Sequence, residues 1–360
     1  MTGIAQRKGD HITLCAEEDV GFRRASTLLE CVRFVHDALP DLAVDAIDTS
    51  IVLLGKKLRA PLVIASMTGG TDEAGRINRV LASIAEERGY AFGLGSQRAM
   101  HVRPESGPSF RVRDVAPSTL VLGNVGVVQA RSMKTSEIAD LLEQVGADAL
   151  CVYLNPAMEL VQSGGDRDFS GGLATIARLV EELPFPVVVK ETGCGIAPAV
   201  GTRLREVGVE HVDVSGAGGT SWVGVEAKRA AAAGDERARE LGEALWDWGI
   251  PTAASVALLA PAGFETIVAT GGIATGLDVA RAIALGANAA GIARPVLRAI
   301  SALGRQGAMD LMATVENELR AVMMLTASPD VAALRRAPRV VVGELGSWIA
   351  QLGGQDHRNR

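Results

Sequence analysis

From about residue 60 onward, short continuous apolar runs alternate with longer amphipathic segments. The apolar runs are rich in Val, Ile, Leu or Ala and are punctuated by Gly, Asn or Ser. Continuous apolar runs without alternation are typical of parallel strands that are buried on both faces. The pattern therefore predicts eight such strands, at residues 61–66, 90–95, 119–123, 149–154, 186–190, 211–215, 265–270 and 289–293.

The segments between these runs carry apolar residues at helical spacing. Residues 76–88, for example, place Ile77, Leu81 and Ile84 on one face, and similar patterns predict helices at 135–145, 172–183, 197–207, 236–248 and 277–285. Strands and helices in this order favour an α/β fold, a (β/α)8 TIM barrel, over an open doubly wound sheet. The turn after the first strand, Thr68-Gly69-Gly70-Thr71, also does not fit the dinucleotide-binding fingerprint of a doubly wound sheet.

The remaining segments are predicted to belong to the same domain, which spans residues 1–360. Residues 1–60 form an N-terminal extension that packs on the barrel, with a mixed helical stretch at 24–39. Residues 60–300 form the barrel core, and residues 305–350 form a C-terminal helical region. Within that region, the apolar spacing of 308–326 predicts a helix in the core or at an oligomer contact. The polar tail, residues 353–360, is expected to fray.

Composition narrows the class of protein. The chain has 360 residues, 48% of them hydrophobic, and a net charge of -6, which argues against binding nucleic acid. No apolar run reaches the roughly 18 residues of a membrane span, and the polar start lacks the apolar core of a signal peptide. The four cysteines lack metal-binding spacing and are expected to be reduced thiols. We therefore expect a cytoplasmic protein that forms a homo-oligomer.

The predicted strand ends share a polar, glycine-rich character. In a barrel the carboxyl ends of all strands face one mouth, and the ends of the last two strands often hold a phosphate. Here those two ends carry Gly271-Gly272 and Ala293-Arg294. Glycines let backbone amides approach an anion closely, so the mouth is predicted to bind a cofactor or substrate that bears phosphate.

Two strand ends carry candidate chemistry. The fourth predicted strand stops abruptly at Asn155-Pro156, and the acidic Glu159 follows. Lys190 ends the apolar strand 186–190. A lysine there could form a Schiff base, or it could act as a cation beside an electron-rich cofactor. The residues leave both roles open.

The ordered motifs resemble the type 2 isopentenyl-diphosphate isomerase family of FMN-dependent barrel enzymes. The resemblance runs from about residue 7 to the C-terminal helix. It is carried by Arg7-Lys8-Gly-Asp10-His11-Ile12, Ser66-Met67-Thr68-Gly69-Gly70, Gly93-Leu-Gly95-Ser96-Gln97-Arg98, Gly123-Asn124-Val-Gly126, Val189-Lys190-Glu191, Asp213-Val-Ser215-Gly-Ala-Gly-Gly-Thr220, Gly271-Gly272-Ile273 and Thr275-Gly-Leu-Asp278.

The resemblance implies a role for each matching residue. Lys190 would stabilise the anionic reduced flavin, and Glu159, with Asn155 beside it, would bind the Mg²⁺ that bridges to the substrate diphosphate. NADPH would serve as the flavin reductant. The diphosphate would be held by Arg7, Lys8 and Arg98, with Ser96 and Gln97 alongside and Met158 facing the prenyl chain. FMN would be lined by Ser66, Met67, Thr68, Ser96, Asn124, Lys190, Ser215, Thr220, Gly271, Gly272, Ile273, Ala293 and Arg294.

The chain departs from the family pattern at two positions that matter for the reaction. Tyr153 stands in place of a histidine, and Met158 in place of a glutamine that is implicated in moving protons on and off the substrate. A thioether has no proton to give. The resemblance implies isomerisation of isopentenyl diphosphate to dimethylallyl diphosphate, and the departures leave three alternatives. These are an FMN-dependent paralogue acting on another prenyl or phosphorylated substrate, a flavin-binding redox sensor, and a hydroxy-acid oxidase, whose strand-end His–Arg pair is not found here.

Overall fold

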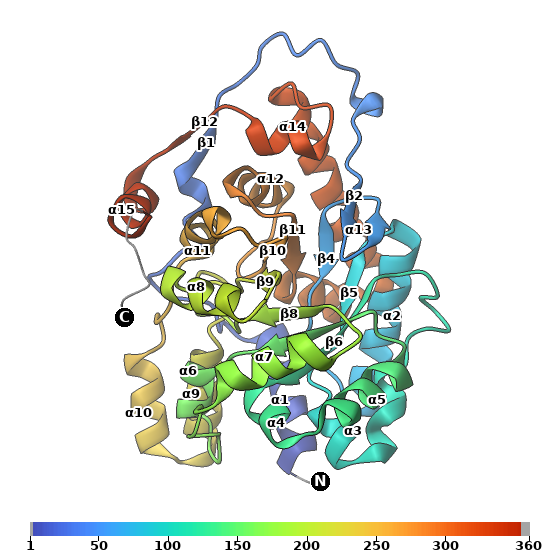
Figure 1. Cartoon of the computed structure of the whole chain (residues 1–360), viewed down its shortest axis with the longest axis vertical. Helices are drawn as coiled ribbons and strands as arrows, with labels where there is room; N and C mark the ends of the chain where they lie inside the picture. Colours follow the sequence, from blue (N-terminus) through green and yellow to red (C-terminus); the bar gives the residue numbers. More distant parts are fainter. Residues whose placement is uncertain (1–2, 354–360) are drawn as a thin grey trace.

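The centre of the molecule is a closed barrel of parallel strands. The computed structural model describes residues 3–353, and the polar tail at 354–360 lies outside the described residues. Within the described part, eight strands close in the order β10-β11-β4-β5-β6-β7-β8-β9 (Figure 1). The strands are β4 Leu62–Ile64, β5 Ala91–Gly93, β6 Val121–Gly126, β7 Ala149–Tyr153, β8 Val187–Lys190, β9 His211–Asp213, β10 Thr266–Ala269 and β11 Ala289–Ile292.

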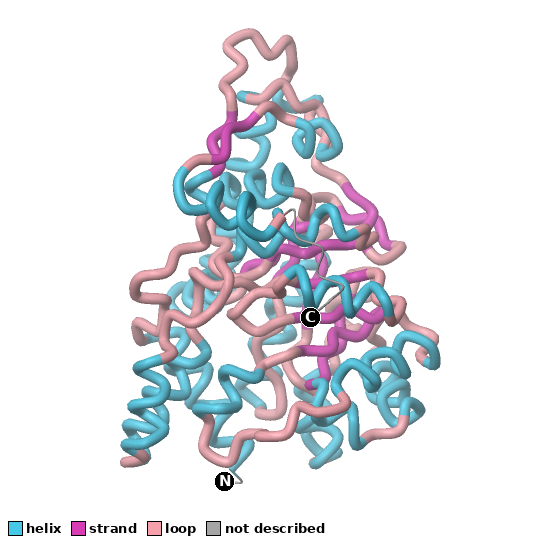
Figure 2. The backbone as a smooth tube through the Cα atoms, turned by 60° about the vertical axis from the view of Figure 1, so that its left-hand side comes forward, coloured by secondary structure: helices cyan, strands magenta, loops and turns pink. Residues whose placement is uncertain are grey.

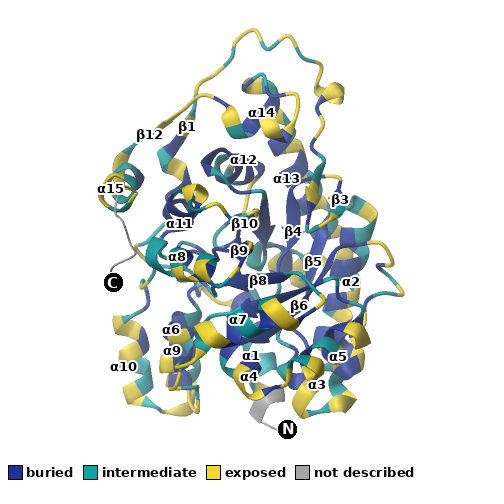
Figure 3. Ribbon diagram, in the orientation of Figure 1, coloured by how far each residue is buried: buried dark blue, intermediate teal, exposed yellow. Residues whose placement is uncertain are grey.

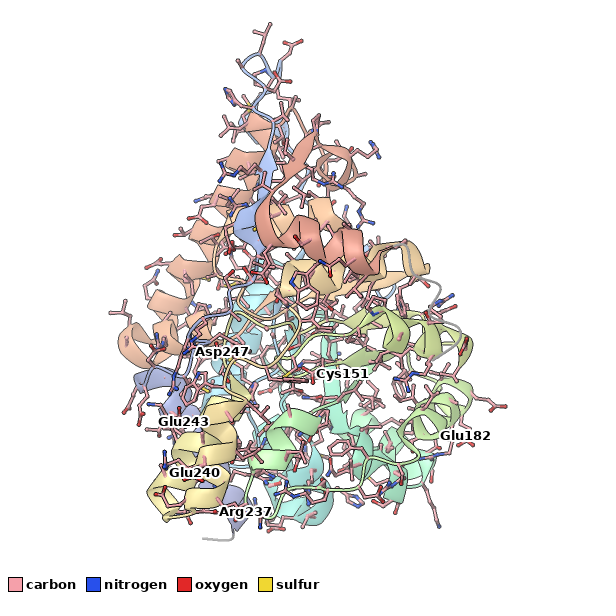
Figure 4. All side chains as sticks on the ribbon, turned by 90° about the vertical axis from the view of Figure 1, so that its left-hand side faces the viewer. Cys151, Glu182, Arg237, Glu240, Glu243 and Asp247 are labelled. Carbon is pink, nitrogen blue, oxygen red and sulfur yellow. The ribbon has the colours of Figure 1, made fainter. Side chains whose placement is uncertain are left out.

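Each predicted apolar run overlaps one of these strands, although β6 extends to Gly126, three residues beyond its predicted run, so the predicted TIM barrel is confirmed. The register sets neighbouring strand ends side by side: Tyr153 of β7 pairs with Lys190 of β8, which pairs with Asp213 of β9. Since all strands run in the same direction, these polar residues meet at one mouth. Cys151, by contrast, points into the interior (Figure 4) and is 2% exposed.

Helices surround the strands (Figure 2). The residues at both ends of helix α2, Asp72–Arg88, explain its bounds: Thr71 accepts a hydrogen bond from the amide of Ala74, and Gly89 ends the helix at φ 70°. The helices that follow α2 along the barrel are α3 Arg98–Val102, α4 Val127–Ser132, α5 Thr135–Val145, α6 Pro156–Val161, α7 Gly172–Glu182, α8 Pro198–Glu206, α9 Trp222–Ala233, α10 Glu236–Ala244, α11 Thr252–Leu259 and α12 Gly276–Leu285.

The N-terminal extension differs from its prediction. A helix, α1 Gly3–Glu17, contacts α13 (Arg294–Leu325) and α9. The helical stretch predicted at 24–39 is wrong. It contains a short 3-10 helix, Leu29–Cys31, and then β1 Val32–Phe34, which pairs antiparallel with β12 Arg339–Val341. The distant partner strand decides this conformation, and Leu28 interrupts any helix there with φ 56°.

A hairpin covers the amino end of the barrel. It consists of β2 Ile51–Leu53 and β3 Lys56–Leu58. Leu53 and Leu58 share a buried apolar cluster with Val63 and Ala91 of the barrel strands. Lys56 also forms an ion pair of 2.7 Å with Asp148, just before β7. The hairpin therefore leaves the opposite, carboxyl end of the barrel as the open one.

The C-terminal region packs against the barrel. The predicted helix at 308–326 is confirmed as the second part of α13, after a break at Gly304 with φ 65°. Met312, Val315 and Leu319 are buried in the main core, as the burial colouring in Figure 3 shows for this helix. The chain ends with α14 Val331–Arg336 and α15 Gly343–Leu352. Among residues 3–353, no helix is both long and apolar enough to span a bilayer.

Candidate active site

Two adjoining cavities occupy the barrel mouth. The first cavity is the larger of the two. They share a wall, made of Lys8, His11, Ser66, Met67, Lys190 and Trp222. Two ligands bound in these cavities would therefore contact the same wall residues.

The first cavity gathers most of the predicted cofactor-binding residues. They come from the ends of β4, β8, β9, β10 and β11, which are far apart in sequence but adjacent in the barrel. Ser96 and Asn124, at the ends of β5 and β6, line the second cavity instead. The first cavity is lined by Ser66, Met67, Thr68, Lys190, Ser215, Thr220, Gly271, Gly272, Ile273, Ala293 and Arg294 from the predicted set.

Glycine backbones pack directly on one another beneath this cavity. A Cβ on Gly219 would lie 2.3 Å from the amide nitrogen of Gly272, and a Cβ on Gly271 would lie 2.1 Å from the carbonyl oxygen of Gly216. Gly271 and Gly272 also have φ of 96° and 76°, where other residues are strained. The loops after β9 and β10 therefore form one rigid, side-chain-free floor that a bound anion can approach closely.

Several buried polar atoms around the cavities lack a partner. Thr68 Oγ1 and Arg294 Nη1 belong to residues of the first cavity, and Asn124 Oδ1 and Thr192 Oγ1 to residues of the second. Within the described residues, no hydrogen bond satisfies these atoms. Since buried polar groups are normally satisfied in proteins, both cavities fit polar ligands, and the first fits a phosphate-bearing group above the glycine floor.

Lys190 stands at the shared wall as a buried cation. It is 8% exposed, and Nζ donates a hydrogen bond of 2.6 Å to the Glu191 carbonyl oxygen. Burial raises the pKa of the neighbouring Asp213 carboxyl, against the opposing effect of Lys190. Asp213 also accepts a hydrogen bond of 2.6 Å from Thr270. The hydrogen bond to the Glu191 carbonyl holds Nζ at a fixed position in the shared wall.

In the second cavity, Glu159 is a buried carboxylate with a fixed orientation. It is 6% exposed and accepts hydrogen bonds from Asn155 Nδ2 at 2.9 Å, Gln162 Nε2 at 3.0 Å and the Asp166 amide at 2.7 Å. Asn155 precedes Pro156, which starts α6 and places Glu159 one turn later. The strand end and the short helix thus bring Asn155 and Glu159 together as the sequence predicted.

Three cations from other elements line the same cavity as this carboxylate. Arg7 and Lys8 come from α1, and Arg98 begins α3; all three line the second cavity. Burial lowers the pKa of Lys8 to about 8, and the charges of Arg7 and Arg98 add to the effect. A dianionic ligand would relieve this repulsion, so the cluster is suited to a phosphate or diphosphate group.

Two residues of the shared wall were not among the predicted site residues. His11 Nε2 lies 2.7 Å from Glu226 Oε1 of α9, and its ring packs edge-on against Trp222 at 5.2 Å between centroids. These contacts hold α1 on α9. His11 could have been found from its spacing, because it lies three residues after Lys8 and four after Arg7. Residues at these spacings share one face of a helix. Trp222 carried no comparable signal.

The structure also places the residues that depart from the family pattern. Tyr153 Oη lies 3.1 Å from Ser96 Oγ at the wall of the second cavity, and burial raises the Tyr153 pKa. Met158 lines the same cavity. Gln97, predicted to contact substrate, is turned away: its amide donates to the Leu141 carbonyl at 3.0 Å, and its oxygen accepts from the Asn124 amide. Gln97 therefore supports the strand ends, because both ends of its amide are already engaged.

All four cysteines are unpaired thiols, as predicted. Cys15 and Cys151 are buried, and burial raises the pKa of each to about 12. Cys15 lines the first cavity. At neutral pH these thiols are protonated and act as small apolar side chains.

Comparison with known proteins identifies the family. The chain is 42% identical to an isopentenyl-diphosphate delta-isomerase of Methanosarcina barkeri over 98% of its own length and 96% of the relative. It is 45% identical to the protein of the same name from a Synechococcus species over 93% and 96%. Residues 154–340 match the FMN-dependent dehydrogenase family.

Solved structures agree on the fold. A mandelate oxidase with bound benzaldehyde superimposes with a TM-score of 0.65, covering 92% of this chain and 94% of that one at 19% identity. At this identity the likeness establishes the barrel alone. The full-length relatives and the family match show that the chain belongs to the isopentenyl-diphosphate delta-isomerase family and to the FMN-dependent dehydrogenase family.

Proposed function

We propose that the protein is an isomerase that interconverts isopentenyl diphosphate and dimethylallyl diphosphate, with reduced FMN in the first cavity and Mg²⁺ on Glu159. One observation carries the proposal: a cavity with a glycine floor and a cavity with three cations and a buried carboxylate share a wall at Lys190. The family name of the full-length relatives favours this reaction over another substrate or a sensor role.

The first cavity suits FMN by its chemistry. Gly271 and Gly272 offer backbone amides to the phosphate, and Arg294 adds a guanidinium with an unpartnered nitrogen. Lys190 would place a positive charge beside the isoalloxazine ring and favour its anionic reduced form. When bound and reduced, FMN supplies acid–base chemistry next to the substrate's double bond. The other residues lining the first cavity would be Ser66, Met67, Thr68, Ser215, Thr220, Ile273 and Ala293. Ser96 and Asn124, which line the second cavity, would approach FMN from that side.

The second cavity would orient the substrate. Arg7, Lys8 and Arg98 would bind the diphosphate through charge-assisted hydrogen bonds, with Ser96 beside them. Glu159 would hold Mg²⁺ together with diphosphate oxygens and water, which is how this ion is usually bound. Asn155 would keep the Glu159 carboxylate in place through its hydrogen bond.

The reaction itself adds one proton to the terminal methylene carbon and removes one from C2, so no net oxidation occurs. Met158 would pack against the hydrocarbon but cannot donate a proton. Tyr153, whose pKa is raised by burial, stays neutral at ordinary pH and can donate a hydrogen bond. NADPH, as the proposed reductant, is needed only to bring FMN into its reduced form.

We also propose that the enzyme works as a homo-oligomer in the cytoplasm, as one domain spanning residues 1–360, with a small-molecule prenyl diphosphate as partner and neither nucleic acid nor membrane. Gel filtration with light scattering would give the mass of the assembly.

The function is tested by an anaerobic assay. Purified protein is loaded with FMN, reduced, and given Mg²⁺ and isopentenyl diphosphate, and the allylic product is measured. We expect the product only when flavin is reduced and Mg²⁺ is present. Protein that binds FMN and shows a yellow colour but forms no allylic diphosphate would contradict the proposed reaction while leaving the cofactor site intact.

We expect kcat/KM to fall at alkaline pH because Lys8 loses its proton. The free protein's Lys8 has a pKa of about 8, so the ammonium is present below this pH and is lost as pH rises through it. Binding of the diphosphate, and with it kcat/KM, should therefore fall above about pH 8. Kinetics from pH 6.5 to roughly 9.5 would check this.

Lys8→Arg provides the matched comparison. Arginine stays charged over this pH range, so the fall should disappear in the variant. An unchanged fall in Lys8→Arg would assign the titration to another group.

A further inference from the structure

Three side chains of metal-ligating types lie together at the amino end of the barrel, away from the mouth. His211 is the first residue of β9, and Glu210 precedes it. Glu265 directly precedes the first residue of β10. One possible ligand atom from each of the three lies within 4.8 Å of the other two. None of them lines either cavity of the candidate active site.

The backbone fixes the two segments that carry these side chains. β9 and β10 are paired neighbours, with His211 opposite Thr266. The amides of Glu265 and Thr266 both donate to the Glu210 carbonyl, at 2.9 and 3.2 Å. The two glutamates therefore start from adjacent positions on neighbouring strands, which lets their carboxylates reach the same point.

The buried imidazole distinguishes this group from an ordinary acidic patch on the surface. His211 is 8% exposed, and its Nδ1 atom is buried without a hydrogen-bond partner. Within residues 3–353, no hydrogen bond or ion pair engages either ring nitrogen. Buried polar side chains normally have a partner, and a neutral imidazole always has one nitrogen with a free lone pair. His211 therefore offers an unused lone pair next to two carboxylates.

The two carboxylates also lack a cation of the protein. Both glutamates are exposed, and no lysine or arginine of the described residues forms an ion pair with either one. Arg205, in the last turn of α8, is engaged elsewhere: it donates to the Val209 carbonyl at 2.6 Å, and its guanidinium lies 5.6 Å from the centre of the Phe264 ring. Since like charges at short range repel each other, a divalent cation between the carboxylates would stabilise this arrangement.

The donor set indicates which ion fits. An imidazole nitrogen suits Zn²⁺ and similar divalent ions, whereas Mg²⁺ prefers oxygen ligands in a strict octahedron. Ligand atoms around a tetrahedral Zn²⁺ lie roughly 3.4 Å apart. The three atoms already lie within 4.8 Å of one another, so rotation of the exposed glutamate side chains would complete the coordination, with water as the fourth ligand.

We propose that Glu210, His211 and Glu265 form a site for a divalent ion of the Zn²⁺ type, which joins the start of β9 to the start of β10. The two carboxylates balance the charge of the ion, and His211 supplies the nitrogen ligand that discriminates against Mg²⁺. The site is separate from the Mg²⁺ proposed on Glu159 and takes no part in the isomerisation.

Calorimetric titration with Zn²⁺ tests the site. The full-length protein is titrated in excess Mg²⁺, which occupies sites that offer oxygen ligands alone. His211→Phe and Glu265→Gln each remove one ligand and should raise the Kd for Zn²⁺ roughly tenfold or more. Glu265→Gln changes only an exposed side chain, so it decides the question even if His211→Phe does not fold.

Two control variants locate the binding. Glu181→Gln removes one exposed carboxylate from α7, and Glu159→Gln removes the carboxylate at the mouth. Both should leave the Kd for Zn²⁺ unchanged. The site would be overturned if the wild type bound no Zn²⁺, if neither His211→Phe nor Glu265→Gln weakened the binding, or if only Glu159→Gln weakened it.

Thermal unfolding gives a second readout. An ion that binds only the folded site stabilises the folded state, so Zn²⁺ should raise the Tm of the wild type and of Glu181→Gln more than that of Glu265→Gln. Equal rises in the wild type and Glu265→Gln would contradict the site. The isomerase assay decides the proposed function separately, because the three ligands lie outside both cavities.

Discussion

Glu159→Gln is expected to lower kcat/KM roughly 100-fold or more, the largest effect of any single change in the second cavity. The substitution removes the negative charge that would attract Mg²⁺. The side-chain amide nitrogen of the new glutamine would also face hydrogen-bond donors. Asn155, Gln162 and the Asp166 amide all donate to the Glu159 carboxylate. Two donors that face each other in a buried site leave unsatisfied groups, which adds to the cost. Steady-state kinetics over a range of Mg²⁺ concentrations would measure the effect.

The flavin spectrum is the internal check on this variant. Glu159 does not line the first cavity, so FMN should bind Glu159→Gln with its ordinary absorbance. Glu240→Gln, on the exposed face of α10 at the surface in Figure 4, is the control for loss of one carboxylate. If Glu159→Gln kept the wild-type kcat/KM and the same dependence on Mg²⁺, the metal would have to be held elsewhere.

Lys190→Met is expected to make the two-electron potential of bound FMN more negative and to slow isomerisation. The ammonium is 8% exposed and lies at the wall that both cavities share. Its loss removes a cation beside the anionic reduced flavin and leaves the buried Asp213 carboxyl without its opposing charge. An interaction of about 1.4 kcal/mol, modest for charges at an effective dielectric constant of about 20, corresponds to a shift of about 30 mV.

Reductive titration against a reference dye would measure that potential. Lys190→Arg keeps the charge, so it should restore most of the potential even if its larger head displaces the substrate. Lys57→Met, an exposed lysine on β3 at the other end of the barrel, is the control. An unchanged potential in Lys190→Met would mean that this lysine acts on the substrate and not on the flavin.

The sequence determined the barrel because buried parallel strands leave a signal that is local. Each strand must be apolar on both faces, so every predicted apolar run after residue 60 overlaps one strand of the closed barrel. The carboxyl ends of such strands must meet at one mouth, which is why Lys190, Gly271 and Arg294 could be predicted to share a site. Motifs at those ends identified the family before any contact was known.

The N-terminal extension shows where local pattern fails. Val32 to Phe34 carried a mixed periodicity that suggested a helix, yet they form a strand because Arg339 to Val341 lie beside them. The partner is some 300 residues away in the chain, and no local spacing encodes that pairing. The same limit hid α1, whose position over the mouth depends on the contact between His11 and Glu226.

Residue types at a motif do not fix where their side chains point. Ser96, Gln97 and Arg98 are consecutive, yet Ser96 and Arg98 line the second cavity while Gln97 binds backbone groups of Leu141 and Asn124. A turn of chain after a strand can send neighbouring side chains in opposite directions, and only the surrounding packing selects which one faces the cavity.

The sequence by itself determined the fold class, the family and the residue types gathered at the mouth, because strand periodicity and glycine turns act over a few residues. The tertiary structure alone decided that two cavities share a wall at Lys190 and that Met158 lines the second of them. Cavities are bounded by side chains from many separate strands and helices. Their shape is therefore a property of packing, which no single stretch of chain contains.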